Sequence, residues 1–258
     1  MDIKKYSIQW GGKPLEIEFN RFAGQANGAC TVRFGDTMVL VTAVMSDNQR
    51  DINYFPLMVE YRESMYAAGK ISGSRFIKRE GRPSDESVLS GRIIDRSIRP
   101  LFDARFRNDI QVVITVLAYD QESDPDVAGL IGAAAAVMAS NIPFAGPIAG
   151  CVVAAKDGQF ILNPTSEVLA TSAMNVFVAG RNMEVVMLEA DGREVREDVA
   201  TQAIEYGLQQ IEPVITLLQT IQQEIGKTKV AAPETVATTD GLAEAKAHYA
   251  ETHATLFG

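Results

Sequence analysis

One segment of the sequence combines an aromatic residue, an aliphatic residue and several cations in a run rich in glycine and serine. Residues 69–83 read GKISGSRFIKREGRP, with Phe76 and Ile77 directly before Lys78 and Arg79. This composition favours an exposed loop. An aromatic face stacks on a base while lysine and arginine hold phosphates, which is how many proteins bind single strands. The alternative, that Phe76 packs into the core and the cations only aid solubility, stays open here.

Three arginines follow this segment at helical spacing. Residues 83–86 (PSDE) are typical of a helix start, with acids in the first turn. Arg92, Arg96 and Arg99 are then four and three residues apart, which places them on one stripe of the helix. Such a stripe either faces phosphate groups, as Arg82 before it would, or pairs with acids elsewhere in the chain. We expect the buried face to come largely from Leu89, Ile93, Ile94 and Leu101.

The charge of the chain is uneven. The 258 residues carry a net charge of −9. Between Lys70 and Arg107, however, ten Lys or Arg stand against five Asp or Glu, a local charge of +5 that leaves −14 for the rest. A basic island on an acidic protein attracts an anion to one place and repels it elsewhere.

Several kinds of chemistry are excluded by residue type. Both histidines, His248 and His253, lie at the C-terminal end, so residues 1–247 can form no Ser-His-Asp triad or His-ligated zinc site. Cys30 and Cys151 are far apart and not in a metal-ligand spacing, so small buried residues are the simpler interpretation than a metal or redox site. No run of about 18 apolar residues or signal peptide is present, which predicts a cytoplasmic protein without a membrane span.

The elements that must position these residues begin with strands. Alternation and tight turns predict hairpins, and the almost wholly apolar strand 38–44 is expected to be central and covered on both faces. The strand pairs that we predict are 6–10 with 15–19, 30–34 with 38–44, 148–155 with 159–162, and 175–179 with 184–189.

Helices are predicted from capping residues and from helical period. Asp124-Pro125 starts a small-residue helix that runs to Ser140. The period becomes helical again from Glu197, and Pro213 is expected to kink or restart that helix. Residues 227–237 read as a linker, and a further helical segment begins near Thr239. Strands, a helix, strands and a long helix together indicate an α+β fold.

At this point the sequence resembles the first core of bacterial polynucleotide phosphorylases. The motifs that carry the resemblance are YAAGKISGSRFIKREGRPS at 66–84, GRIIDRSIRPLF at 91–102, NGACTVRFGDTMVLVTA at 27–43 and IPFAGPIAG at 142–150. LNPT at 162–165 and VAG at 178–180 also match, and the resemblance covers residues 1 to about 225. One departure is Arg75, which looks like an extra residue before the aromatic-basic loop of the family, here Phe76 to Arg79.

The resemblance implies a ribonuclease PH-like fold (ribosomal protein S5 domain 2-like). The first core would span residues 1–226, the linker 227–237, and the incomplete start of an all-helical domain 238–258. In this family three chains form a ring around a channel for single-stranded RNA. The family attacks the 3′-terminal phosphodiester with inorganic phosphate, releases nucleoside diphosphates, and uses Mg²⁺ held by two aspartates near a lysine.

Those three catalytic residues belong to the second core of the family. Aligned on Val178-Ala179-Gly180, the aspartate positions here read Leu169 and Asn175, and the lysine position reads Phe177. Leucine and phenylalanine cannot bind a hard cation, and asparagine offers only a neutral carbonyl. The resemblance therefore implies a core without metal or catalytic residues.

We therefore expect the N-terminal part of a 3′-to-5′ phosphorolytic exoribonuclease that degrades single-stranded RNA, including mRNA. This part would contribute RNA guiding and ring assembly, with Phe76, Ile77, Lys78, Arg79, Arg82, Arg92, Arg96 and Arg99 in contact with RNA. The full-length family enzyme would be a homotrimer that meets RNA-degradosome partners. Two alternatives are a non-catalytic RNA-binding ring subunit of an exosome-like complex, and an enzyme that binds a small phosphorylated metabolite.

Overall fold

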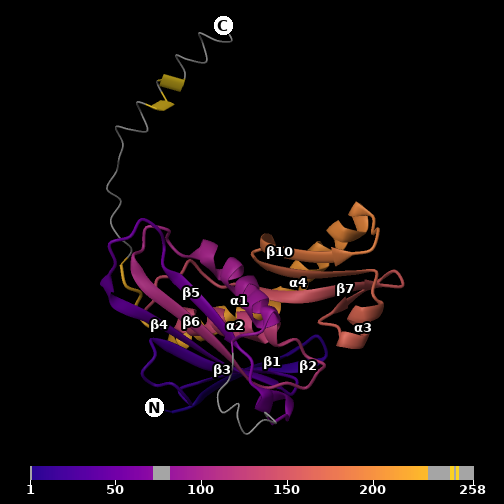
Figure 1. Ribbon diagram of the computed structural model, residues 1–258, viewed down its shortest axis with the longest axis horizontal. Helices are drawn as coiled ribbons and strands as arrows, with labels where there is room; N and C mark the ends of the chain where they lie inside the picture. The colour runs from indigo at the N-terminus through magenta and orange to yellow at the C-terminus, as the bar shows by residue number, and fades with distance from the viewer. Residues whose placement is uncertain (1, 72–81, 232–244, 247, 250–258) are drawn as a thin grey trace.

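The computed structural model describes residues 2–71, 82–231, 245–246 and 248–249. Phe76 to Arg79, and most of the expected helical segment 238–258, lie outside the described residues. The described part contains two β-sheets, with α1 and α2 near the centre of the molecule between strands β4–β6 and strands β7–β10 (Figure 1). The expected α+β architecture is confirmed.

The first sheet has six strands in the order β1-β2-β3-β4-β6-β5, and only its edge pair β5–β6 is parallel. Its strands are β1 (Lys4–Trp10), β2 (Lys13–Phe19), β3 (Gly28–Phe34), β4 (Thr37–Gln49), β5 (Leu57–Arg62) and β6 (Asn108–Ala118). The second sheet is antiparallel in the order β10-β9-β7-β8. Its strands are β7 (Ala149–Lys156), β8 (Gln159–Leu162), β9 (Met174–Arg181) and β10 (Glu184–Gly192).

The four predicted hairpins are confirmed by these pairings. Their turns use residues that tolerate positive φ. Gly11 and Gly12 have φ of 56° and 78°, and Asp157 and Gly158 have φ of 51° and 77°. These values match the left-handed backbone of two-residue hairpin loops. Turn chemistry therefore set the register of these strands.

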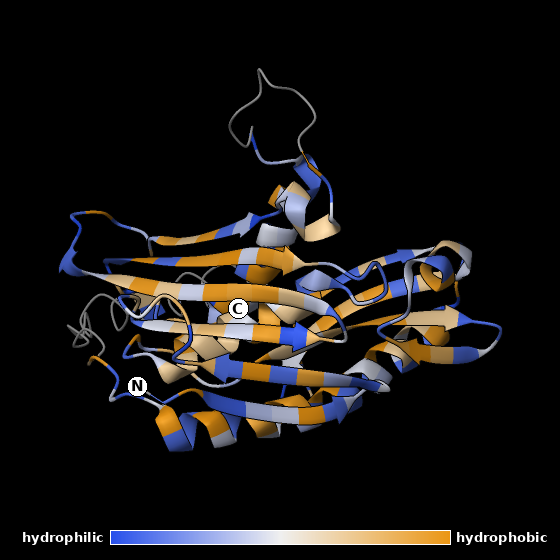
Figure 2. Ribbon diagram, turned by 90° about the horizontal axis from the view of Figure 1, so that it is seen from below, coloured by the Kyte–Doolittle hydropathy of each residue, from blue (hydrophilic) through white to orange (hydrophobic). Residues whose placement is uncertain are grey.

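The expectation that β4 is covered on both faces is wrong. β4 is central, since it pairs with β3 and β6, but burial alternates along it. Val39, Val41 and Ala43 are fully buried, whereas Met38 and Leu40 are half-buried on the opposite face. Apolar and polar residues alternate along many strands in Figure 2. One face of an antiparallel sheet can meet solvent, so an apolar run did not require a second covering layer.

The helices are α1 (Asp85–Ile98), α2 (Pro125–Ala139), α3 (Ser166–Thr171) and α4 (Glu197–Ile225), with short 3-10 helices η1 (Met65–Ala68) and η2 (Arg99–Leu101). As predicted, α2 begins at Asp124, whose carboxylate accepts a hydrogen bond from the backbone of Asp126 at 2.8 Å. Nearly every residue of α2 is buried, against β3 and β4 on one side and β7 and α4 on the other. Its small residues allow this approach: a Cβ on Gly132 would stand 2.5 Å from Val41.

Helix α4 does not restart at Pro213, which was one of the two predicted effects of this proline. The helix is continuous from Glu197 to Ile225 with Pro213 inside it. Proline removes the donor that would bond the carbonyl of Gln209, one turn earlier. The Trp10 indole donates instead to the adjacent carbonyl of Gln210 at 2.7 Å, and Val214 and Ile215 are buried. Tertiary packing therefore holds the helix through the proline.

The segment that follows α4 is bound to the C-terminal end of α2. Lys229 donates to the carbonyls of Val137, Met138 and Ser140 at 2.8, 2.9 and 2.8 Å. Backbone N–H groups of Lys227 and Val230 donate to Ala139 and Asn141. Burial lowers the pKa of Lys229 to about 8, while the three carbonyls at a helix C-terminus favour its charged form. In the described chain, no helix is both long and apolar enough to cross a membrane.

Candidate nucleic-acid interface and a pocket without metal ligands

Helix α1 positions the predicted arginine stripe. Its start is fixed by Ser84, whose hydroxyl accepts from the Ser87 backbone at 3.0 Å. Its inner face packs on β5 and α2, where Ile94 and Ile98 are fully buried. The side chains of Arg92 and Arg96 are exposed on the other side and form no ion pair or hydrogen bond with any described residue. These two guanidinium groups are therefore available to an anion.

The helix buries fewer apolar residues than the sequence indicated. Ile94 and Leu101 are buried and Ile93 is half-buried, but Leu89 is 60% exposed. The prediction that Leu89 belongs to the buried face is wrong. Gly91 lies against β5 instead, and a Cβ built there would be 3.5 Å from Tyr61 and 3.6 Å from the Val59 carbonyl. The inner face is centred on Gly91 because its missing side chain lets α1 approach the strand.

Arg99 has a different environment from Arg92 and Arg96. Its guanidinium pairs with Asp95 at 2.7 Å and donates to the Leu57 carbonyl at 3.0 Å, at the edge strand β5. It also lies 5.9 Å from the centre of the Phe55 ring. Arg99 therefore holds α1 and β5 together through its contacts with a carboxylate, a strand carbonyl and an aromatic ring. Its Asp95 partner, one helical turn earlier, could have been found from the i to i+4 spacing.

In the basic segment, residues 69–83, the structure describes residues 69–71 and 82–83. Arg82 is exposed and pairs with no described acid. The chain there lies beside the end of β5, because the Ser84 hydroxyl donates to Glu63 at 3.3 Å. Arg82 therefore lies at the end of the molecule that also contains η1 and the start of α1. Phe76, Ile77, Lys78 and Arg79 lie outside the described residues, and their contact with RNA stays a prediction.

Two carboxylates stand at the start of α2, close to α1 and β5. Burial, followed by the nearby charge of Asp124, raises the pKa of Asp126 to about 7. Burial also raises the pKa of Asp124. Ser90 of α1 and Tyr61 of β5 face Asp126, with Glu63 as a further negative charge. The sequence alone did not reveal this group, since nothing local shows that an N-terminal helical acid will be part-buried.

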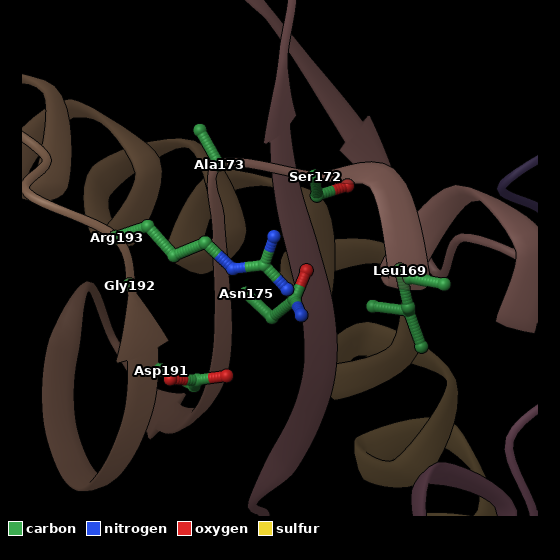
Figure 3. Close-up of a pocket in the computed structure, with 8 residues that line it drawn as sticks. Leu169, Ser172, Ala173, Asn175, Asp191, Gly192 and Arg193 are labelled. Atoms are coloured by element: carbon green, nitrogen blue, oxygen red, sulfur yellow. The ribbon is translucent and has the colours of Figure 1, made fainter.

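The residues at the family metal positions meet in an open pocket of about 270 Å³. Leu169 and Asn175 line it, whereas Phe177 is buried in β9 and does not. Figure 3 shows the Arg193 guanidinium extending toward Asn175, with Leu169 on the other side. The Asn175 Oδ1 atom is enclosed without a hydrogen-bond partner. Leu169 thus brings an aliphatic side chain to a place where a hard cation would need oxygen.

This pocket does not fit Mg²⁺. One carboxylate, Asp191, lines it, together with the cationic Arg193, which opposes a second positive charge. Among the residues that the structure describes, no group of three or more His, Cys, Asp or Glu side chains could hold a metal ion. Cys30 and Cys151 are buried and separate, as expected, and burial raises the pKa of each thiol to about 12.

Comparison with solved structures places the fold in a known class. Rice (Oryza sativa) Rrp46 superposes with a TM-score of 0.65 at 13% identity, over 86% of this chain and 95% of that one. A chain of the Archaeoglobus fulgidus exosome with RNA bound to the active site gives 0.60 at 15% identity, over 81% and 84%. Sequence identities this low support a conclusion about the fold alone. The fold is ribonuclease PH-like.

Sequence comparison then identifies the family. Residues 11–143 match the 3′ exoribonuclease family, domain 1, and residues 146–210 match its domain 2. The chain belongs to the 3′ exoribonuclease family.

Curated relatives are much longer than this chain. The polyribonucleotide nucleotidyltransferases of Halalkalibacterium halodurans and Geobacillus kaustophilus are 47% and 48% identical over 225 residues. Those residues are 87% of this chain but 32% and 31% of the relatives. The chain therefore spans about a third of the length of the proteins that it matches.

Proposed function

We propose that this chain is the RNA-guiding, non-catalytic first core of a polyribonucleotide nucleotidyltransferase. The observation that carries the proposal is the contrast between two places in the structure. Arg92 and Arg96 present guanidinium groups that pair with no described residue, whereas the pocket at Leu169 and Asn175 offers a single carboxylate, Asp191, beside the cationic Arg193. The arginines on α1 can bind a polyanion, and the pocket cannot bind the cation that phosphoryl chemistry needs.

The reaction proposed for the whole protein is 3′-to-5′ phosphorolysis of single-stranded RNA. Inorganic phosphate attacks the 3′-terminal phosphorus, the bond to the preceding 3′ oxygen breaks, and a nucleoside diphosphate leaves. Mg²⁺ would be bound outside the region described here. This chain would orient the RNA backbone by charge and its bases by stacking.

The proposed RNA contacts follow the order of the chain. Phe76 and Ile77 would contact bases, while Lys78, Arg79 and Arg82 would hold phosphates. Arg92 and Arg96 would continue this track along α1. Arg99 would add its positive charge to the same surface while its side chain holds β5.

Assembly and location are further parts of the proposal. A homotrimeric ring with possible RNA-degradosome partners, in the cytoplasm, would suit an enzyme that processes and degrades mRNA. Residues 1–226 would form the core and 227–237 the linker to the helical segment 238–258. The likeness to Rrp46 and to the archaeal exosome chain favours one alternative, a non-catalytic ring subunit. A reading frame that continues past Gly258 into a second similar core would support the main proposal.

The test is a paired assay on the 258-residue chain. Fluorescence anisotropy with a labelled single-stranded RNA should show weak binding that falls as salt rises. The same protein, given RNA, phosphate and Mg²⁺, should release no nucleoside diphosphate, because the pocket lacks the ligands for the metal. Sustained diphosphate release by this chain would contradict the non-catalytic role, and an absence of RNA binding would contradict the guiding role.

A further inference from the structure

Four large apolar side chains are exposed around the 3-10 helix η1. Met65 and Tyr66 are each 57% exposed, Tyr119 is 36% exposed and Ile71 is 92% exposed. Single exposed apolar residues are common on protein surfaces, but a cluster of them marks an interaction site. Two of the four carry aromatic rings, which can stack on a flat partner.

Backbone hydrogen bonds bring together the chain segments that carry Met65, Tyr66 and Tyr119. The backbone N–H of Lys70 donates to Met65 at 2.9 Å, and that of Gly69 donates to Tyr66 at 3.0 Å, which closes η1 with Gly69 at φ 68°. The N–H of Tyr119, at the end of β6, donates to the Ala67 carbonyl at 3.0 Å. Residues from two distant parts of the sequence therefore form one surface.

The segment that follows this surface favours a polyanion, because residues 69–83 contain five Lys or Arg and one Glu. Lys70 and Arg82 are exposed and pair with no described acid. The carboxylate of Asp120, the acid next to Tyr119, accepts hydrogen bonds from the backbone N–H groups of Asp36, Glu122 and Ser123. Glu63, Asp85 and Glu86 are also exposed close by in the sequence, so three acids share this part of the surface with the two cations.

We infer that Tyr66, with Met65 and Tyr119 beside it, forms a base-stacking platform for single-stranded RNA next to the basic segment. The inference rests on the proposed function and extends it to residues outside the aromatic-basic loop. Stacking is tolerant of sequence because every base has a π-face. Lys70 and Arg82 would hold the phosphates that flank the stacked base.

The experiment compares variants with a matched control in an RNA-binding assay. A short single-stranded oligoadenylate that carries fluorescein is titrated with the wild-type chain, Tyr66→Leu, Tyr66→Phe and Tyr54→Leu. Tyr54 is 58% exposed but precedes β5, whereas Tyr66 follows it, so the two tyrosines lie at opposite ends of a six-residue strand. Thermal melts of all four proteins check folding.

The expected result is a loss of at least about fivefold in affinity for Tyr66→Leu, with Tyr66→Phe and Tyr54→Leu close to wild type. An oligoadenylate with one 2-aminopurine should also lose fluorescence on binding to wild type and less so on binding to Tyr66→Leu. If wild type binds RNA and Tyr66→Leu binds equally well, the platform is refuted and the proposed function stands. If wild type itself does not bind, the proposed function fails.

One outcome would assign the surface to a protein partner instead. Unchanged RNA affinity for Tyr66→Leu, together with a wild-type self-association that this variant loses in analytical ultracentrifugation, would replace the platform by a contact between copies of the chain. Aromatic residues and methionine are also enriched at such contacts.

Discussion

Three arginines of one helical stripe have two different roles because of their neighbours. Arg99 has Asp95 one turn before it and the carbonyl of Leu57 across the strand edge, so its five donors are largely used within the chain. Arg92 and Arg96 lack such partners among the described residues. At the scale of the residue, the type and the spacing predicted where the positive charges lie but not which of them are free.

This difference predicts the outcome of a double substitution. Arg92→Ala with Arg96→Ala should weaken RNA binding and reduce the slope of log affinity against log salt by roughly 0.7 for each phosphate that the protein no longer neutralises. Anisotropy titrations at several salt concentrations measure both quantities. Arg196→Ala is the control, since Arg196 is also exposed but pairs with Asp198 at 3.0 Å on α4. An unchanged salt slope in the double variant would remove α1 from the RNA interface.

A second residue-scale prediction concerns Asp126 and pH. Its pKa of about 7 lies above the ordinary value of 3.8, so the folded chain binds this proton more tightly than the unfolded chain. The stability from this group is therefore fully present below pH 4 and is lost as pH rises through 7. Asp126→Asn should remove this loss, so the melting temperature of wild type relative to Asp126→Asn should fall between about pH 4 and 7 and change little above pH 7. A pH-independent difference would show that Asp126 ionises as an exposed carboxylate.

At the scale of the element, α2 determines how closely the layers can approach. Its backbone lies so near β3 that a Cβ on Gly28 would stand 2.1 Å from the Ala136 carbonyl oxygen. A helix that is buried on all sides cannot move away without disturbing both sheets. The alanines and glycines of α2 thus matter for the distance between layers rather than for helix propensity.

Gly28→Ala should therefore destabilise the fold by roughly 1–3 kcal/mol, because backbone rather than a flexible side chain opposes the new methyl group. Urea denaturation measures the change in the free energy of unfolding. Gly24→Ala is the matched control, because a Cβ at Gly24 meets nothing within 4 Å. Equal stabilities of the two variants would mean that α2 can shift at small cost.

The elements differ in how well the sequence predicted them. Hairpins were found because their turns need residues such as Asp157-Gly158, which leave a local signal. The edge strand β5 and its neighbour β6 were not predicted, because their parallel pairing joins segments that are far apart in the sequence. Pro213 and Leu89 were misjudged for the same reason: Trp10 and Gly91 make the decisive contacts, and both depend on tertiary structure.

The candidate site was predictable in chemistry but only partly in geometry. The resemblance led to Leu169, Asn175 and Phe177, of which the first two line a common pocket. The resemblance gave no indication that Arg193 would extend toward Asn175, since Arg193 follows a different strand. The same holds for Tyr66 and Tyr119, which are 53 residues apart in the sequence and are brought near each other by the hydrogen bond from the Tyr119 backbone N–H to the Ala67 carbonyl.

At the scale of the whole molecule, the exposed arginines and the pocket at the family metal positions belong to different elements. The chain is acidic with a basic island, which would draw a polyanion toward one end and disfavour it elsewhere. The pocket at Leu169 is lined by residues of α3, β9 and β10, whereas the exposed arginines Arg92 and Arg96 lie on α1. Under the proposed function, a core built in this way would guide a substrate that another part of the protein transforms.

The anchoring of Lys229 sets the starting point of whatever follows in the chain. Residues that read as linker in the sequence are immobilised as far as Val230, so a tether to a neighbouring unit would be shorter than its sequence suggests. The volume that a tethered unit can explore shrinks with the length of its free tether, and its effective concentration rises accordingly. By shortening the free tether, the ammonium group of Lys229 would raise the frequency of encounters between two parts of one chain.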